Sequence, residues 1–210
     1  MEKTAPNCTQ TLPEGYREIL SVDLQQDKKL AFLINGAAVA AMLVLSEVGH
    51  LIVPLSVLVD SSLGLGPYLL RFGVLLAGLA AYIVLHELTH AAVMKLFSRD
   101  RVRFGLQMGM AYAGSDTLFR RTHYLAVALA PVTLWGLVFL ALNLLLPGDW
   151  FWPVYVLQLL NLSGAAGDLY VSWMFARRKD AFLVQDTGLE MTVFTPAKKA
   201  EGPAAGGEAR

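Results

Sequence analysis

The chain has 210 residues, of which 55% are hydrophobic and 16% are charged, and its mean hydropathy is +0.50. These proportions lie outside the usual range for a soluble domain of this size and indicate a protein of the lipid bilayer. Acidic and basic residues are equal in number, so no basic excess points to a nucleic-acid partner. The single cysteine, Cys8, excludes an intramolecular disulfide and a cysteine-rich zinc site.

A polar, charged segment at residues 1–29 precedes the first apolar run. A cleaved secretory signal would have its apolar region much nearer the start, so we expect the first span to be retained. Four stretches are apolar enough to cross a bilayer, whose hydrocarbon core of about 30 Å requires about 20 helical residues. These predicted spans are residues 30–53, 68–94, 124–146 and 151–176.

The charges of the connecting segments predict the orientation of the spans. Lys and Arg are concentrated between the second and third spans and after the fourth span, whereas the first connection has none before Arg71. Positive charge next to spans marks the cytoplasmic side. The sequence therefore predicts an all-α integral membrane protein with four transmembrane helices and both termini in the cytoplasm.

The remaining segments are short. Residues 102–117 alternate partly and contain several glycines, which predicts a short cytoplasmic hairpin between spans two and three. A second extended pair is an option near residues 182–194, and we assign it no part in the chemistry. From about residue 196 the chain has too little apolar surface to fold and is expected to be disordered. The predicted organisation is a cytoplasmic segment at 1–29, a four-span membrane domain at 30–178 and a cytoplasmic segment at 179–210.

The second predicted span contains the segment His-Glu-Leu-Thr-His at residues 86–90. Residues four apart lie on one face of a helix, so His86 and His90 can bind one zinc ion while Glu87 lies beside them. Zinc lowers the pKa of its water from about 16 to about 7, and a neighbouring carboxylate can accept that proton and pass it to the leaving amine. The alternative, polar packing at a helix end, is disfavoured because ionisable groups within a membrane usually mark a site.

A catalytic zinc usually takes three protein ligands and leaves one position open. Depth in the membrane favours Asp168, because His86 and Asp168 each lie nine residues, or about 13 Å, before a cytoplasmic basic residue. Asp116 and His123 are shallower alternatives. The other three candidates would each need a large excursion to reach the histidines: Glu190, His50 and Glu47.

The surroundings of Asp168 also favour a ligand. The small residues 164–167 let a neighbouring helix approach closely. The alternative role of Asp168 is a buried ion pair, which is disfavoured because its predicted span contains no Lys or Arg. Asn161 is a candidate to orient a ligand or to hold an extended substrate backbone, and ordinary interhelical hydrogen bonding is an equal alternative.

Three groups of residues resemble the putative zincin peptidase family of small bacterial four-span membrane proteins, which are similar to the core of site-2 proteases. These groups are His86 to His90 in the second span, Ala130-Pro131 in the third, and Asn161 with Gly167-Asp168 in the fourth. The resemblance covers residues 12–178. It implies that His86, His90 and Asp168 hold Zn2+ and that Glu87 is the general base. Site-2 proteases usually have Asp-Gly in the third-ligand motif, whereas the order here is Gly167-Asp168-Leu169.

We therefore expect an intramembrane zinc metalloprotease of the bacterial cytoplasmic membrane, with its site toward the cytoplasm and a membrane protein or peptide as substrate. The glycine-rich hairpin at 105–114 is a candidate to bind an extended substrate by strand addition. A non-catalytic membrane chaperone, immunity factor or complex subunit is the alternative. Glu87 favours the enzyme, since a structural zinc site is usually closed and needs no free carboxylate. A transporter or channel is disfavoured because no inverted repeat is visible.

Overall fold

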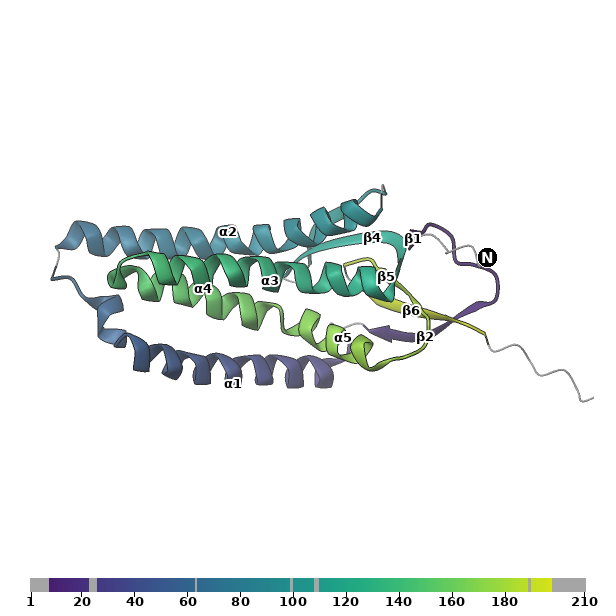
Figure 1. Cartoon of the computed structure of the whole chain (residues 1–210), viewed down its shortest axis with the longest axis horizontal. Helices are drawn as coiled ribbons and strands as arrows, with labels where there is room; N and C mark the ends of the chain where they lie inside the picture. The colour runs from purple at the N-terminus through teal and green to yellow at the C-terminus, as the bar shows by residue number, and fades with distance from the viewer. Residues whose placement is uncertain are drawn as a thin grey trace, which may run out of the picture.

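The computed structural model describes residues 8–22, 26–62, 64–98, 100–107, 110–188 and 190–197. Its helices lie side by side along the long axis, and its strands gather at one end of the bundle (Figure 1). The helices are α1 (Lys28–Ile52), α2 (Leu65–Phe97), α3 (Arg121–Leu145), α4 (Phe151–Gly164) and α5 (Ala166–Arg177), with short 3-10 turns η1 (Leu55–Val59) and η2 (Gly148–Trp150).

Three helices of the described chain are long and apolar enough to cross a membrane: α1, α2 and α3, with 25, 33 and 25 residues. The fourth expected span is two helices, α4 with 14 residues and α5 with 12. The break falls at Ala165, which follows Gly164, a residue with a low helix propensity. Because α5 begins there, Asp168 lies in a first helical turn, where free N–H groups favour a carboxylate.

The expectation of an all-α protein is wrong, because the described residues also form a six-stranded antiparallel sheet. Its order is β1-β4-β5-β6-β2, and β3 pairs with β4 outside this path. The strands are β1 (Cys8–Thr9), β2 (Tyr16–Val22), β3 (Arg103–Gln107), β4 (Met110–Arg120), β5 (Leu183–Asp186) and β6 (Met191–Pro196). Segments far apart in the sequence pair here, and such pairing leaves little local pattern.

Both extended segments considered from the sequence are present in the structure. The hairpin expected at 102–117 is β3 paired with β4, from Arg103 opposite Gly114 onward. The option of an extended pair near 182–194 is β5 paired with β6. The side of a membrane on which they lie, and the domain boundaries at residues 29 and 178, stay predictions. The tail expected to be disordered lies outside the described residues beyond residue 197.

A hydrophobic core joins the sheet to the ends of three helices. Its buried residues come from helices α2, α3 and α5, from strands β4, β5 and β6, and from the connection between α5 and β5. They are Met94, Phe119, Tyr124, Val127, Ala128, Val171, Phe175, Phe182, Val184, Met191 and Val193. The sheet is thereby packed against the bundle. In contrast, α1 is peripheral, since none of its most apolar 18-residue window is buried.

Candidate metal centre

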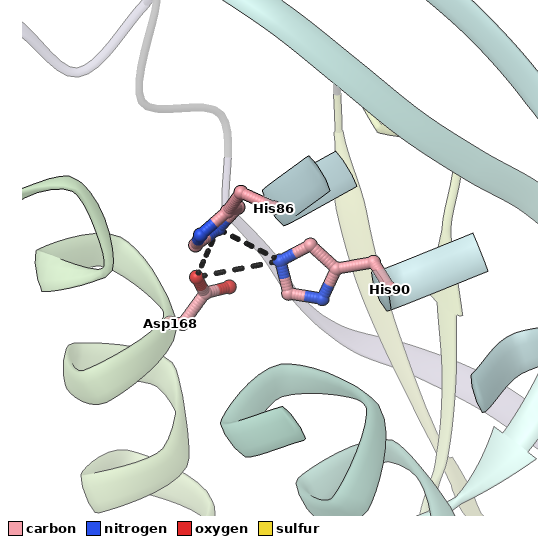
Figure 2. A group of neighbouring side chains, drawn as sticks. All are labelled: His86, His90 and Asp168. Atoms are coloured by element: carbon pink, nitrogen blue, oxygen red, sulfur yellow. Dashed lines mark hydrogen bonds and ion pairs between the residues drawn. The ribbon is translucent and has the colours of Figure 1, made fainter. Parts of the chain in front are cut away.

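Three side chains from two helices face one another where the bundle meets the sheet (Figure 2). His86 and His90 lie one turn apart on α2, and Asp168 projects from α5. The Nε2 atoms of His86 and His90 are 3.2 Å apart. Oδ2 of Asp168 lies 3.4 Å from Nε2 of His86 and 3.5 Å from Nε2 of His90. Both histidines are buried, whereas the Asp168 side chain is 24% exposed. The structure thus brings together the three residues predicted to bind zinc.

The triangle of donor atoms fits a tetrahedral zinc ion. Bonds of about 2.0–2.1 Å to tetrahedrally arranged ligands separate the donor atoms by about 3.3–3.4 Å. The three observed separations, 3.2, 3.4 and 3.5 Å, lie around that value. Within the described ranges, the ion-pair partners found for Asp168 are these two histidines, so a Lys or Arg partner gains no support.

The hydrogen bond of His90 sets which of its nitrogens faces the centre. Nδ1 of His90 lies 3.0 Å from the carbonyl oxygen of Val127 in α3. A carbonyl only accepts, so Nδ1 carries the proton and donates it. The lone pair of Nε2 is then directed toward Asp168, as a metal ligand requires.

A relay of two side chains sets the same tautomer in His86. The amide of Asn161 donates through Nδ2 to the Val132 carbonyl at 3.1 Å, which turns Oδ1 toward Tyr82. The Tyr82 hydroxyl donates to that Oδ1 at 2.8 Å and therefore accepts from Nδ1 of His86, also at 2.8 Å. His86 is left with a free Nε2 lone pair, matching His90.

Asn161 therefore has contacts that fit one of its predicted roles, the orientation of a ligand. Its side chain is fully buried, at 0% exposure, and it bonds Tyr82 and Val132 rather than lining the adjacent cavity. The sequence analysis missed Tyr82. A local signal exists for it, since Tyr82 precedes His86 by four residues and so lies on the same helical face.

The three residues open onto a cavity of about 270 Å³ between the helices and the sheet. Glu87, half-buried, lines this cavity beside the histidines, and the backbone N–H of Ala113 in β4 lies within hydrogen-bonding reach of its carboxylate. Four carboxylates line the cavity: Glu87, Asp168, Asp186 and Glu190. Among the described residues that line it there is no Lys or Arg. Its polar lining is therefore strongly acidic.

Two of those carboxylates come from a segment that the sequence analysis left out of the chemistry. Asp186 accepts hydrogen bonds from the Tyr124 hydroxyl at 2.6 Å and from the Gly188 N–H at 2.8 Å. Burial raises the pKa of Asp186 above its usual value, although both donors act to lower the pKa. Glu190 accepts a hydrogen bond from Ser21 at 2.6 Å. The sheet thus carries two residues of the segment 182–194 to the cavity wall, a position that the sequence did not predict.

Four of the other candidates for the third ligand lie elsewhere. The fifth, Glu190, was expected to need a large excursion, but the sheet carries it to the cavity wall, outside the group of donor atoms. Asp116 pairs with Arg103 on the exposed side of the hairpin, and the ring of His123 packs against Phe97. His50 accepts the backbone N–H of Leu55 at the opposite end of α1, and Glu47 is exposed on that helix. Among the described residues, Asp168 is the side chain that joins His86 and His90 in a group able to hold a metal ion.

The mostly helical fold and this group define a class first: an apolar, mostly helical protein with a group of side chains that can hold a metal ion. A family model described as "Putative zincin peptidase" matches residues 79–183, half of the chain. The chain belongs to this family. The family's name indicates a zinc-dependent peptidase, in agreement with the resemblance stated from the motifs. No curated protein and no solved structure matches the chain.

Proposed function

We propose that the protein is an intramembrane zinc metalloprotease that hydrolyses peptide bonds in or next to a membrane span. The observation that carries the proposal is the His86, His90 and Asp168 triangle, with Glu87 beside it on one cavity. A structural metal site has no need of an accessible cavity or of a carboxylate outside the ligand set.

The proposal includes four membrane crossings with both termini in the cytoplasm. Helices α4 and α5, with 14 and 12 residues, together have the length of one further crossing. The segments with predicted cytoplasmic charge all contribute strands to one sheet at one end of the bundle. At the other end, Arg71 donates to the carbonyls of Asp60 and Asp149, which joins the two connections predicted to be external. The site then lies toward the cytoplasm.

Each residue of the centre has a chemical task. A zinc ion held by His86, His90 and Asp168 supplies Lewis-acid chemistry, polarising the scissile carbonyl and acidifying water. Glu87 takes the proton of the attacking water as the water oxygen bonds the carbonyl carbon. Glu87 then delivers that proton to the amide nitrogen as the C–N bond breaks, which leaves a carboxylic acid and an amine. The Nδ1–H bonds keep both imidazoles in the required tautomer and orientation.

The hairpin of β3 and β4 offers a place for the substrate backbone. A helical segment bonds its own carbonyls, so it must unwind before it can be cleaved. Ala111 to Ala113 of β4 line the cavity, with β3 on one edge, and pairing with β5 begins only at Ser115. Thr187 and Gly188 already lie against Gly114 and Ala113, so an extended substrate would pair with the part of β4 at Ala111 and Tyr112.

The acidic cavity favours a substrate with Lys or Arg close to the scissile bond. Asp168 and Glu87 would be offset by the zinc ion, which leaves Asp186 and Glu190 as the acidic groups of the wall; they attract basic side chains and disfavour acidic ones. Cytoplasmic flanks of membrane spans are rich in such residues. The proposed substrate class is thus the basic, cytoplasm-facing end of a membrane span.

The test combines metal content with cleavage in membranes. Purified wild type and the Glu87→Gln variant are expected to hold about one zinc per chain, measured by mass spectrometry, whereas His86→Ala, His90→Ala and Asp168→Ala lose it. Peptide termini in native membranes are compared by mass spectrometry between wild type and Glu87→Gln, which should lack the new termini. A wild type without zinc, or identical termini in both strains, would overturn the proposal; the second result favours a non-catalytic subunit.

A further inference from the structure

We propose that Pro131 is a positioning residue of the metal centre, because its missing amide N–H leaves the Val127 carbonyl for the Nδ1–H of His90. The inference rests on the proposed metal-binding function of His90. It assigns a chemical reason to a proline in the middle of an apolar helix.

The ladder of backbone hydrogen bonds in α3 is interrupted at Pro131. In an α-helix the N–H of each residue bonds the carbonyl four residues earlier, so the helical donor for Val127 would be residue 131. That residue is proline, which has no N–H, and it lies within α3. A proline ring also crowds the carbonyl four residues before it and displaces that carbonyl from the helical line. The Val127 carbonyl is therefore left without its usual helical donor.

His90 supplies the missing donor. Its Nδ1 lies 3.0 Å from the Val127 oxygen, and Val127 is 1% exposed while His90 is 9% exposed. Pro131 is itself fully buried. Since water has little access to this carbonyl, the imidazole N–H is the group that satisfies it. The bond in turn holds the proton on Nδ1 and directs Nε2 toward Asp168 and His86.

His86 is held by a different carbonyl of α3, one that keeps its helical donor. That anchor is the Val132 carbonyl, whose helical donor is the N–H of Gly136. His86 is linked to this carbonyl through the side chains of Tyr82 and Asn161. Position 136 has no side chain to crowd the Asn161 amide, since a Cβ there would lie 3.3 Å from Nδ2. Both metal-ligand histidines of α2 are thus oriented by carbonyls of α3, but only His90 is bonded directly.

A purely structural role for Pro131, such as a kink for packing, makes a different prediction. Replacing it would then alter helix stability and leave the properties of His90 unchanged. In the present proposal, an N–H at position 131 competes with His90 for the Val127 carbonyl and draws that carbonyl back to the helical line, so the bond to His90 weakens. The two roles are separated by measurements on His90 and on zinc binding rather than by stability.

The experiment uses the full-length protein in detergent. Zinc affinity, measured by competition with a chromogenic chelator, is expected to fall about 10- to 100-fold in Pro131→Ala, as for other losses of a partner to a zinc-binding histidine. Pro67→Ala is the matched control, because this proline lies in the first turn of α2, where a restored N–H has no helical carbonyl to capture. The control should keep wild-type affinity.

A rescue variant isolates the missing N–H from the proline ring. The α-hydroxy analogue of alanine, introduced at position 131 by nonsense suppression, forms an ester that has neither ring nor N–H. It should restore zinc affinity to within a few-fold of wild type. An ester variant as weak as Pro131→Ala would overturn the proposal, and so would unchanged affinity in Pro131→Ala. If Pro131→Ala does not fold, Pro131→Gly supplies the N–H instead.

A second readout separates this inference from the proposed function. Two-bond nitrogen–proton NMR correlations on histidine-labelled, metal-free protein, at a pH at which His90 is neutral, report which of its nitrogens carries the proton. Wild type should show the Nδ1–H tautomer, and Pro131→Ala a mixture with the Nε2–H form. A wild type that binds no zinc would refute the proposed function, while the same tautomer in both proteins would refute the role of Pro131.

Discussion

Replacement of Tyr82 by Phe tests the relay that orients His86. The hydroxyl bridges Nδ1 of His86 and Oδ1 of Asn161, each at 2.8 Å, and Tyr82 is 4% exposed. Removing it leaves two buried polar groups unpaired, at about 1–3 kcal/mol each for the free energy of unfolding. The loss of orientation should weaken zinc binding about 10- to 100-fold, or about 1.4–2.8 kcal/mol.

The assay has a matched control. The hydroxyl of Tyr155 also donates a hydrogen bond, to the Leu45 carbonyl at 2.6 Å, but it lies between α1 and α4, away from the metal centre. Tyr155→Phe should therefore lower stability without changing zinc affinity, both measured on detergent-purified protein. Equal zinc affinity for Tyr82→Phe and wild type, at matched folding, would refute the reasoning that the relay orients His86.

Three further predictions concern residues around the site and at the opposite end. Glu190→Gln removes a cavity charge, so cleavage of peptides with a basic flank should drop several-fold relative to neutral peptides, and an unchanged ratio would refute the proposed charge selectivity. Arg71→Met removes the bonds to Asp60 and Asp149 and should lower the free energy of unfolding by about 2–4 kcal/mol without changing zinc content. The raised pKa of Asp186 favours folding below its unfolded pKa, and this contribution is lost as pH rises through the raised folded pKa. The stability of wild type relative to Asp186→Asn should therefore fall with pH in thermal unfolding from pH 5 to 8, and a constant difference would contradict the assignment.

The candidate site shows how far local reasoning extends. The spacing of His86, Glu87 and His90 is a property of one helix, so helical periodicity alone was enough to group them. Asp168 was selected by depth, which depends only on distances along helices from charged boundaries. Tyr82 obeys the same four-residue rule and could have been recognised. Its partner Asn161 comes from another helix, so their hydrogen bond depends on packing.

The sheet and the cavity wall lay beyond that reasoning. β2 pairs with β6, where Tyr16 lies opposite Pro196, and β4 pairs with β5, where Arg120 lies opposite Leu183. No local pattern specifies the register of such distant pairs. Asp186 and Glu190 reach the cavity only through this pairing. The division of the fourth apolar stretch at Ala165 likewise depends on how α4 and α5 pack, since the whole stretch is apolar enough for one continuous helix.

The sequence by itself determined the apolar helices, the balance of charge at their ends and the zinc-binding pattern on α2. These features depend on composition and on contacts within one or two helical turns, which are set by neighbours along the chain. Only the tertiary structure decided which carbonyl each histidine bonds, which acidic residues surround the cavity and how three distant segments close it with a sheet. Such contacts join residues that are remote in sequence, and packing alone brings them within hydrogen-bonding distance.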